Sequence, residues 1–127
     1  MTSLHNSLKP DKPIFLQIKE GIENDIMLGI IKPGDQIPST NDIASFYGIN
    51  PITVMKGVSL MADEGTIFKK RGVGMFVSEG AAGILSDSYR RSFSDEHLKP
   101  LAARAKSLGI TKEELGGLIA EIWEESK

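Results

Sequence analysis

The sequence contains no cysteine, and it has no long hydrophobic run. Without thiols, the protein has no disulfide bond, no thiolate zinc site and no cysteine nucleophile. No apolar stretch approaches the roughly 20 residues that a helix needs to cross a bilayer, and the N-terminus lacks the apolar core of a signal peptide. These absences predict a soluble, cytoplasmic protein with no membrane partner.

The sequence also lacks an excess of positive charge. Its 15 Lys and Arg against 17 Asp and Glu give a net charge of −2 and a pI of about 5.7, whereas a basic footprint is the usual first sign of a DNA-binding protein. Residues 1–78 hold eight charged residues of each sign, and residues 79–127 hold seven basic and nine acidic ones. Any basic surface must therefore be local.

Residue types that serve catalysis or metal binding are few. His5 and His97 are the only histidines and lie in different regions of the chain, so a metal site would have to combine one of them with carboxylates. The segment Arg71–Gly74 has a G-x-G pattern but neither the third glycine nor the following helix of a dinucleotide-binding loop. No polar cluster indicates an effector. We therefore expect no enzyme activity, no cofactor and no metal site.

The first half of the chain contains the pattern of a helix. With 40% hydrophobic and 25% charged residues among 127, the composition is that of a soluble globular protein. Residues 1–12 are polar and are predicted to form a mobile arm. Pro13 suits the first turn of a helix and Gly29 suits its end. Apolar residues recur every four positions and predict one buried stripe on this helix: Ile14, Ile18, Ile22 and Ile26. Leu28 is the last residue of the stripe.

Two further helices are predicted after a Pro-Gly turn. Ser39 is a suitable N-cap for the first of them and Gly48 a suitable stop, with an apolar side made of Ile43, Ala44 and Phe46. For the next helix, Asn50 is a strong N-cap and Pro51 fits the first helical position. Its buried stripe follows the spacing i, i+3, i+4 and i+7: Val54, Gly57, Val58 and Met61.

A β-hairpin is predicted to follow. Its strands are Thr66–Lys69 and Met75–Val77, and the loop Lys70–Gly74 between them needs glycine conformations. Lys69, Lys70 and Arg71 concentrate positive charge near its tip. A Lys-Lys-Arg run alone is more often a solvated hairpin, but beside these helices it indicates DNA binding.

Three helices followed by a hairpin, with a tight turn between the second and third, is the order of a winged helix-turn-helix, an α+β fold. In that motif one helix braces against the sugar-phosphate backbone while the next lays its N-terminal residues into the major groove. The N-terminus of this third helix is also expected to offer unpaired N–H groups and a positive dipole to phosphate. The helix face opposite the buried stripe carries Ile52, Thr53, Met55 and Lys56.

The C-terminal part is predicted to be a tail of two helices. After a linker or loose helix start at 80–83, one helix runs from about Ile84 to Leu108 and kinks or restarts at Pro100. Thr111 and Glu114 form a capping box for the second helix. Because buried aromatics dominate interfaces, Trp123 is a candidate dimer anchor, although a core or surface role is an equal alternative. The apolar face that predicts dimerisation comprises Leu115, Leu118, Ile119 and Ile122.

The chain is accordingly divided into a DNA-binding domain at 11–79 and a helical dimerisation tail at 80–127.

The stretch from Pro13 to Val77 resembles the DNA-binding domain of the GntR family of transcription regulators. The Asn50-Pro51 opening, with Thr53, Val54 and Lys56, and the short tail resemble its YtrA subfamily, in which about two helices after the wing serve dimerisation. The matching segments occur in family order and spacing across about half of the chain: 13–18, 32–39, 49–54, 64–65 and 71–77.

The resemblance implies three groups of DNA-binding residues. At the start of the second helix, facing the DNA backbone, are Ser39, Thr40 and Asn41. On the recognition helix are Asn50, Pro51, Ile52, Thr53 and Lys56. At the wing tip, which approaches the minor groove in the family, are Lys70, Arg71 and Gly72.

Four positions depart from the family pattern. Asn41 stands where the family usually has a phosphate-contacting arginine. Ile52 replaces a usual asparagine, which removes a polar contact and offers an apolar one to a thymine methyl. Gly57 and Val58 replace a common Ala-Tyr pair and are expected to loosen the core side of the helix. These changes bear on the operator sequence more than on the DNA-binding role.

The sequence thus predicts a homodimeric transcription regulator, a repressor, that binds a near-palindromic operator in double-stranded DNA, because two-fold proteins favour two-fold sites. The alternative is a winged-helix protein-interaction module without DNA binding, which the acidic total charge and Asn41 would suit.

Overall fold

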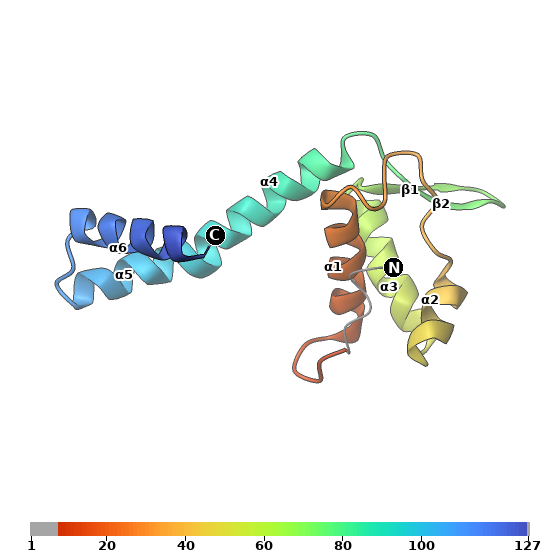
Figure 1. Ribbon diagram of the computed structural model, residues 1–127. Coiled ribbons are helices and arrows are strands. Elements are labelled where there is room, and N and C mark those ends of the chain that lie inside the picture. The colour runs from red at the N-terminus through yellow and green to blue at the C-terminus, as the bar shows by residue number, and fades with distance from the viewer. Residues whose placement is uncertain (1–7, 127) are drawn as a thin grey trace. The chain divides into compact units, whose positions relative to one another are not determined.

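A computed structural model describes residues 8–126, and the chain divides into two compact units between Asp87 and Ser88. The order of elements confirms the predicted α+β winged helix-turn-helix with a helical C-terminal region (Figure 1). The first unit contains α1 (Ile14–Met27), α2 (Thr40–Tyr47), α3 (Pro51–Asp63), β1 (Ile67–Lys70) and β2 (Gly74–Val77). Helix α4 (Ala81–Phe93) begins in the first unit and ends in the second, which continues with η2 (Ser94–Leu98), α5 (Lys99–Ser107) and α6 (Lys112–Glu125).

Helix α1 buries the middle of its predicted stripe. Ile18, Ile22 and Ile26 expose at most 2% of their surface. The two ends of the stripe were predicted wrongly, because Ile14 is 38% and Leu28 66% exposed. Leu28 already caps the helix, and Gly29 turns the chain away with a φ of 75°, so its side chain cannot follow the helical stripe into the core.

Gly57 allows α1 and α3 to approach each other closely. A Cβ at this position would lie 2.5 Å from the carbonyl oxygen of Phe15 in α1, where no real Cβ atom fits. The expectation that Gly57 loosens this side of the helix is therefore wrong. The missing side chain brings the two helix backbones together, and the four residues of the predicted stripe in α3 are all buried.

The caps of α2 and α3 are those that the sequence predicts. The Ser39 hydroxyl accepts a hydrogen bond from the Asp42 amide at 3.0 Å, and Gly48 ends α2 with a φ of 65°. Pro51 begins α3 directly after the Asn50 cap. Phe46 is an exception, because it is 58% exposed. Only Ile43 and Ala44 of α2 are buried, so this two-turn helix has a narrower apolar side than predicted.

The segment before α2 braces the hairpin as a third, irregular strand. Gln36 forms an antiparallel bridge with Phe76 of β2, and the amide of Ile37 donates to the carbonyl of Met75 at 2.9 Å. In the hairpin, Lys70 pairs with Gly74. Both residues therefore belong to the strands, and the loop is shorter than the predicted Lys70–Gly74 because only Arg71–Val73 remain outside the ladder.

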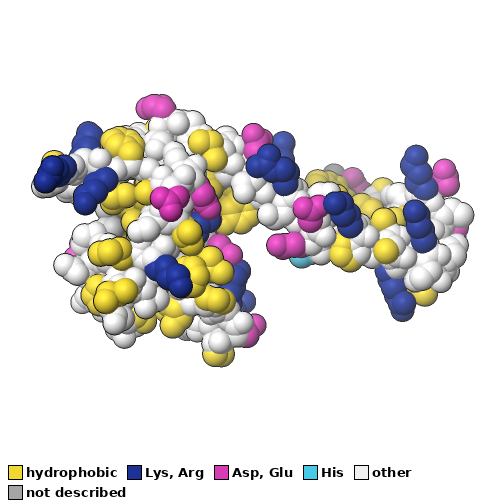
Figure 2. Space-filling view, turned by 180° about the vertical axis from the view of Figure 1, so that it is seen from behind, with side chains coloured by type: hydrophobic (Ala, Val, Ile, Leu, Met, Phe, Trp, Pro, Cys, Tyr) yellow, Lys and Arg dark blue, Asp and Glu magenta, His cyan; other side chains and the backbone are white. Residues whose placement is uncertain are grey.

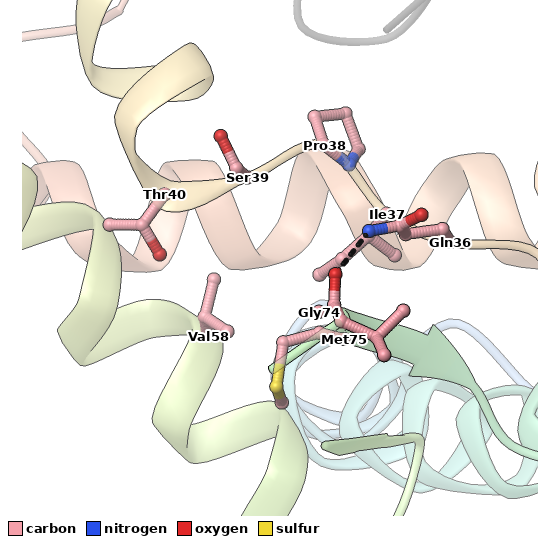
Figure 3. Close-up of a pocket in the computed structure, with 9 residues that line it drawn as sticks. Gln36, Ile37, Pro38, Ser39, Thr40, Val58, Gly74 and Met75 are labelled. Carbon is pink, nitrogen blue, oxygen red and sulfur yellow. Dashed lines mark hydrogen bonds between the residues drawn. The ribbon is translucent and has the colours of Figure 1, made fainter. Parts of the chain in front are cut away.

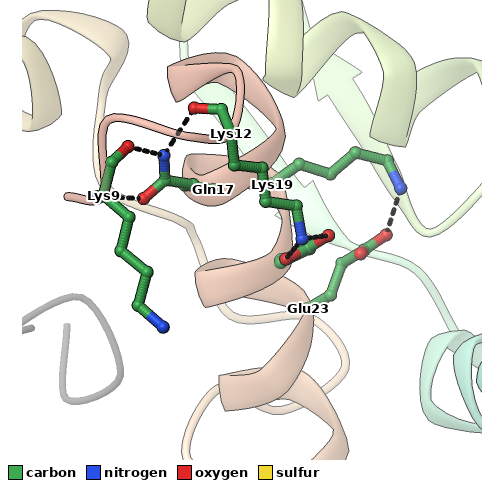
Figure 4. A network of polar contacts seen from close by, with 6 residues as sticks. Lys9, Lys12, Gln17, Lys19 and Glu23 are labelled. Atoms are coloured by element: carbon green, nitrogen blue, oxygen red, sulfur yellow. Dashed lines mark hydrogen bonds and ion pairs between the residues drawn. The ribbon is translucent and has the colours of Figure 1, made fainter.

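Gln17 fixes the segment that precedes α1 (Figure 4). Its side-chain oxygen accepts from the Lys9 amide at 2.7 Å, and its side-chain nitrogen donates to the carbonyls of Lys9 and Lys12 at 2.6 and 2.7 Å. Lys12 also pairs with Glu20. The prediction of a mobile arm is therefore wrong for 9–12, while 1–7 lie outside the described residues.

Replacing Gln17 with leucine should release this segment. The variant keeps the size and the helix propensity of the side chain but removes all three hydrogen bonds. We expect faster hydrogen exchange at the Lys9 amide, measured by NMR, with little change in melting temperature because the contacts are exposed. Equal exchange rates in the variant and the wild type would show that Gln17 does not hold the segment.

Lys19 of α1 links a buried carboxylate of its own helix, Glu23, to the half-exposed Glu64 that follows α3. Lys19 contacts Glu23, which is 1% exposed, at 2.8 Å and Glu64 at 3.1 Å; Figure 4 shows the Lys19–Glu23 contact. Burial alone would lower the pKa of Lys19, but the hydrogen bonds and charges of the two glutamates outweigh it and raise the pKa above its ordinary value. Lys19 therefore stays charged and balances a carboxylate in the core.

The second unit is built from the predicted helices, with one irregular turn. A π-helical segment, η2, lies directly before Pro100, which occupies the first turn of α5. Proline lacks an N–H and clashes with the preceding turn, so the chain widens there and restarts the helix. The predicted capping box is confirmed, and the hydrogen bonds from Thr111 hold the pKa of Glu114 below its ordinary value. Among the described helices, none has the length and apolarity to span a bilayer.

Candidate nucleic-acid interface

The outer face of α3 carries apolar side chains. Ile52 is 73% exposed and Met55 is 54% exposed, and both lie opposite the buried stripe of this helix. Asn50 and Pro51 are exposed at its start, while Thr53 is half-buried. The structure therefore brings the predicted residues of the recognition helix to one surface, with Thr53 at its margin.

The backbone N–H groups at the start of α3 are occupied, contrary to the sequence-based expectation. Pro51 has no N–H to offer. The Ile52 amide donates to Oδ1 of Asn50 at 2.9 Å, and the amides of Thr53 and Val54 donate to the Asn50 backbone carbonyl. The Asn50 cap thus accepts hydrogen bonds from the same backbone N–H groups that would otherwise bind a phosphate. Contacts between α3 and phosphate must therefore come from side chains.

Lys56 lies at the edge of α3 that faces α1. Its ammonium nitrogen is 4.2 Å from the centre of the Phe15 ring, a distance at which a cation is attracted to an aromatic face. The contact favours this position of the exposed lysine by about 0.5–1 kcal/mol. The sequence analysis did not assign Phe15 a role, because a contact between residues 41 positions apart leaves no local signal.

The start of α2 supplies small polar side chains. Ser39 and Asn41 are exposed and Thr40 is half-buried. The Ser39 oxygen already accepts the Asp42 amide, so its hydroxyl proton is the group left for a ligand. This helix end thus offers hydroxyl and carboxamide groups beside the exposed Asp42 carboxylate in its first turn, and it carries no positive side chain.

At the other end of α2, burial and the negative charge of Asp25 raise the pKa of Tyr47 above its ordinary value. Like an ordinary tyrosine, Tyr47 is neutral near pH 7, and the shift only moves its ionisation further from neutral pH.

The wing concentrates positive charge (Figure 2). Lys69, Lys70 and Arg71 are exposed, and within the described part of the chain no carboxylate forms an ion pair with them. Gly72, with a φ of 77°, makes the tight turn that brings Arg71 to the tip. These residues are the local basic surface that the net charge conceals.

The wing lysine next to the tip is supported by aromatic rings. Lys70 Nζ lies 4.4 Å from the centre of the Phe76 ring and 6.0 Å from that of Phe68. The two rings stack on each other across the hairpin with centres 6.0 Å apart. The sequence analysis read Phe68 and Phe76 only as strand residues, but their cross-strand register makes them a platform for this ammonium group.

A small pocket of about 200 Å³ lies between the start of α2 and the wing (Figure 3). Gln36 closes one side by donating from Nε2 to the Val73 carbonyl at 2.9 Å. Gln36 thereby connects the wing loop to the segment leading into α2. The other lining residues are Ile37, Pro38, Ser39, Thr40, Val58, Gly74 and Met75.

Together these elements place cations on the wing and at the α1 edge, beside polar and apolar groups of α2 and α3 and the Asp42 carboxylate. The wing supplies Lys69, Lys70 and Arg71, and the α1 edge supplies Lys56, whereas α2 and the face of α3 between them contribute polar and apolar groups. Cations suit the phosphates of a duplex, and neutral groups suit the base edges between them. The arrangement has the chemistry of a surface that spans a groove of DNA.

Comparison with known sequences identifies relatives along most of the chain. Residues 15–77 match the family described as bacterial regulatory proteins, gntR family. The chain is similar to the HTH-type transcriptional repressor YtrA of Bacillus subtilis, with 36% identity over 110 residues that cover 87% of this chain and 84% of YtrA. It is also 32% identical to the HTH-type transcriptional regulator YhcF of the same organism over 112 residues, 88% of this chain and 91% of YhcF.

Solved structures show the same arrangement. A GntR-family protein from Bacteroides thetaiotaomicron superposes with a TM-score of 0.78 at 29% identity, covering 90% of this chain and 99% of that one. The DNA-binding domain of AraR in complex with its operator ORX1 superposes with a TM-score of 0.51 at 28% identity, covering 58% of this chain and 90% of that domain.

Proposed function

Because this chain belongs to the GntR family of bacterial regulatory proteins, we propose that it is a sequence-specific DNA-binding transcription regulator. The observation that carries this proposal is the combination of an unpaired cationic wing with a neutral recognition helix, in a fold shared with a domain solved on operator DNA. The alternative of a protein-interaction module is less well supported, because it gives the three wing cations no role.

In this proposal each element of the first unit, which corresponds to 11–79, has its own task on the duplex. The start of α2 faces the sugar-phosphate backbone, α3 lies in the major groove and the wing approaches the minor groove. Lys56 and the wing residues provide charge, whereas Asn50 and Pro51 set the position of α3. The proposed contact residues are Ser39, Thr40, Asn41, Asn50, Pro51, Ile52, Thr53, Lys56, Lys70, Arg71 and Gly72.

The tail, 80–127, is proposed to be a dimerisation element; Lys127 lies outside the described residues. From Ser88 onward only Ala105 is buried among the described residues, and α6 buries none of its own. A unit of this size without a core needs a partner to be stable. Its apolar side chains supply the surface: Leu115 is half-buried, and Leu118, Ile119, Ile122 and Trp123 are 43–72% exposed.

A second copy of the chain is the proposed partner. Covering the α6 face with the same face of another copy forms an isologous dimer, which places two winged helices on a two-fold operator. The similarity to YtrA, a repressor, over most of both chains favours repression as the regulatory outcome. We place this activity in the cytoplasm, where bacterial DNA is bound.

The salt dependence of binding tests the DNA-binding role. Fragments of the host genome retained by the protein should lose affinity steeply as salt rises, with a slope set by the number of phosphates contacted. If the full-length protein retains no fragment even at low salt, the proposal is wrong.

Arg71→Ala should lower that slope by about one if the guanidinium contacts a phosphate, or cost ~1–3 kcal/mol of binding free energy if it contacts a base. Arg104→Ala is the matched control, because Arg104 is an exposed arginine of α5, outside the proposed interface. Titrations at several salt concentrations measure both quantities. An Arg71 variant with the affinity and slope of the wild type would remove the wing from the interface.

A further inference from the structure

The apolar face of α3 points to a specific mode of base recognition. Resting on the proposed DNA-binding function, we propose that Ile52 and Met55 read the C5-methyl groups of pyrimidines in the major groove. The chemical class recognised is a 5-methylpyrimidine: thymine in ordinary DNA, and equally 5-methylcytosine where DNA is methylated.

The placement of the two side chains supports this reading. Ile52 and Met55 are three positions apart on α3, so they are neighbours on one helix face. Both are large apolar side chains that the fold leaves uncovered, 73% and 54% exposed. Ile52 is also rigid, because it is β-branched and sits in the first turn, where its amide is bound to Asn50. A rigid apolar side chain at the N-terminal end of α3 can pack against the C5-methyl group of a pyrimidine with little loss of side-chain entropy.

The usual polar readers of bases are missing from this face. Direct readout relies mostly on Arg or Lys with guanine and on Asn or Gln with adenine. The only such residue within α3 is Lys56, and its ammonium group lies over the Phe15 ring at the α1 edge. At the cap, the side-chain oxygen of Asn50 accepts the Ile52 amide, so its carboxamide is engaged at the helix end instead of free to pair with a base.

The occupant of this face is DNA rather than an apolar protein surface because of its surroundings. Lys56 lies at one edge of α3, and the wing carries three exposed cations without ion-pair partners in the described chain. A partner that contacts both Lys56 and the wing has to carry negative charge at its two edges, and it needs apolar groups where it meets Ile52 and Met55. In a duplex, phosphates flank the groove and thymine methyl groups line its floor.

The test removes single methyl groups from the DNA. Uracil differs from thymine only by lacking the C5-methyl, so a genomic fragment bound by the full-length protein is resynthesised with one uracil at each thymine in turn. We expect the affinity to fall about threefold to tenfold at one or two positions in each half-site, as expected for losing one buried methyl contact. Affinity that is indifferent to uracil at every position would overturn the proposal.

Matched variants assign the effect to the two residues. Ile52→Ser should abolish the response to uracil at one position while Ile52→Val retains it, because serine has no methyl group to contact a pyrimidine methyl whereas valine keeps a β-branched apolar side chain. Met55→Gln and Met55→Leu form the corresponding pair. If the response to uracil persists unchanged in both Ile52→Ser and Met55→Gln, other residues read the methyl groups and the proposal is wrong.

Methylated cytosine provides an independent readout. Replacing a responsive T·A pair with C·G should weaken binding, and 5-methylcytosine at the same position should restore part of the loss. A protein that retains no duplex at all would contradict the DNA-binding function itself. Salt-dependent binding without any methyl response, in contrast, would contradict only the methyl reading.

Discussion

Leu118→Asp should convert the protein from a dimer into a monomer and weaken operator binding by at least about a hundredfold, the usual size of the avidity gained by linking two binding modules. Leu118 is 47% exposed in the single chain, on the apolar face of α6. If a second copy covers this face, the variant buries a carboxylate without a cation, which costs several kcal/mol. Sedimentation equilibrium measures the mass, and titration of a two-half-site duplex measures the affinity.

Two controls make this result specific. Glu121→Ala changes an exposed residue of the same helix that lies off the apolar face, and it should leave both mass and affinity as they are. A duplex carrying a single half-site should bind the Leu118→Asp variant and the wild type with similar affinity, since it cannot benefit from the second winged helix. An unchanged mass for Leu118→Asp would place the interface elsewhere.

Gly57→Ala should destabilise the winged-helix unit by roughly 1–3 kcal/mol, in the range of other overpacked core sites. The added methyl would stand 2.5 Å from the Phe15 carbonyl oxygen, and that atom belongs to the backbone, so α1 as a whole has to move. The shift should also disturb Lys56, whose ammonium group lies over the Phe15 ring. Thermal unfolding should show a melting temperature lower by roughly 4–24 °C.

Gly117→Ala is the matched control, because it makes the same substitution in the interior of another helix. A Cβ at Gly117 meets nothing within 4 Å, so the change should favour α6 by about 0.5–1 kcal/mol through helix propensity. Equal stability of Gly57→Ala and the wild type would mean that α1 and α3 are less closely packed than the structure indicates.

The elements that follow from local rules could be predicted from the sequence. The caps of α2, α3 and α6 are set by residues within a few positions of each helix end, namely Ser39, Asn50 and Thr111. The buried stripe of α3 follows from helical periodicity alone. For this reason the sequence alone predicts the order of elements in the winged-helix unit.

What the sequence could not reveal depends on contacts between distant residues. The Lys56 ammonium group has its position because α1 supplies Phe15, and the residues before α1 are ordered because Gln17 reaches back to them. The prediction of free N–H groups on α3 overlooked a local conflict, since a strong cap satisfies the same donors that an anion would use. Phe46 was assigned to the core by residue type, yet α2 is too short to bury it.

The strand-like brace at Gln36 limits how this fold can vary among its relatives. The amide of Gly34 donates to the Val77 carbonyl and that of Ile37 to Met75, and Ser39 caps α2 only two residues later. Inserting or deleting one residue between them would move the start of α2 by about 3.3 Å and reverse the faces of the brace. Insertions and deletions among relatives should therefore occur in 29–33, before the brace. Substitutions in α3, in contrast, would change the DNA sequence that the protein recognises.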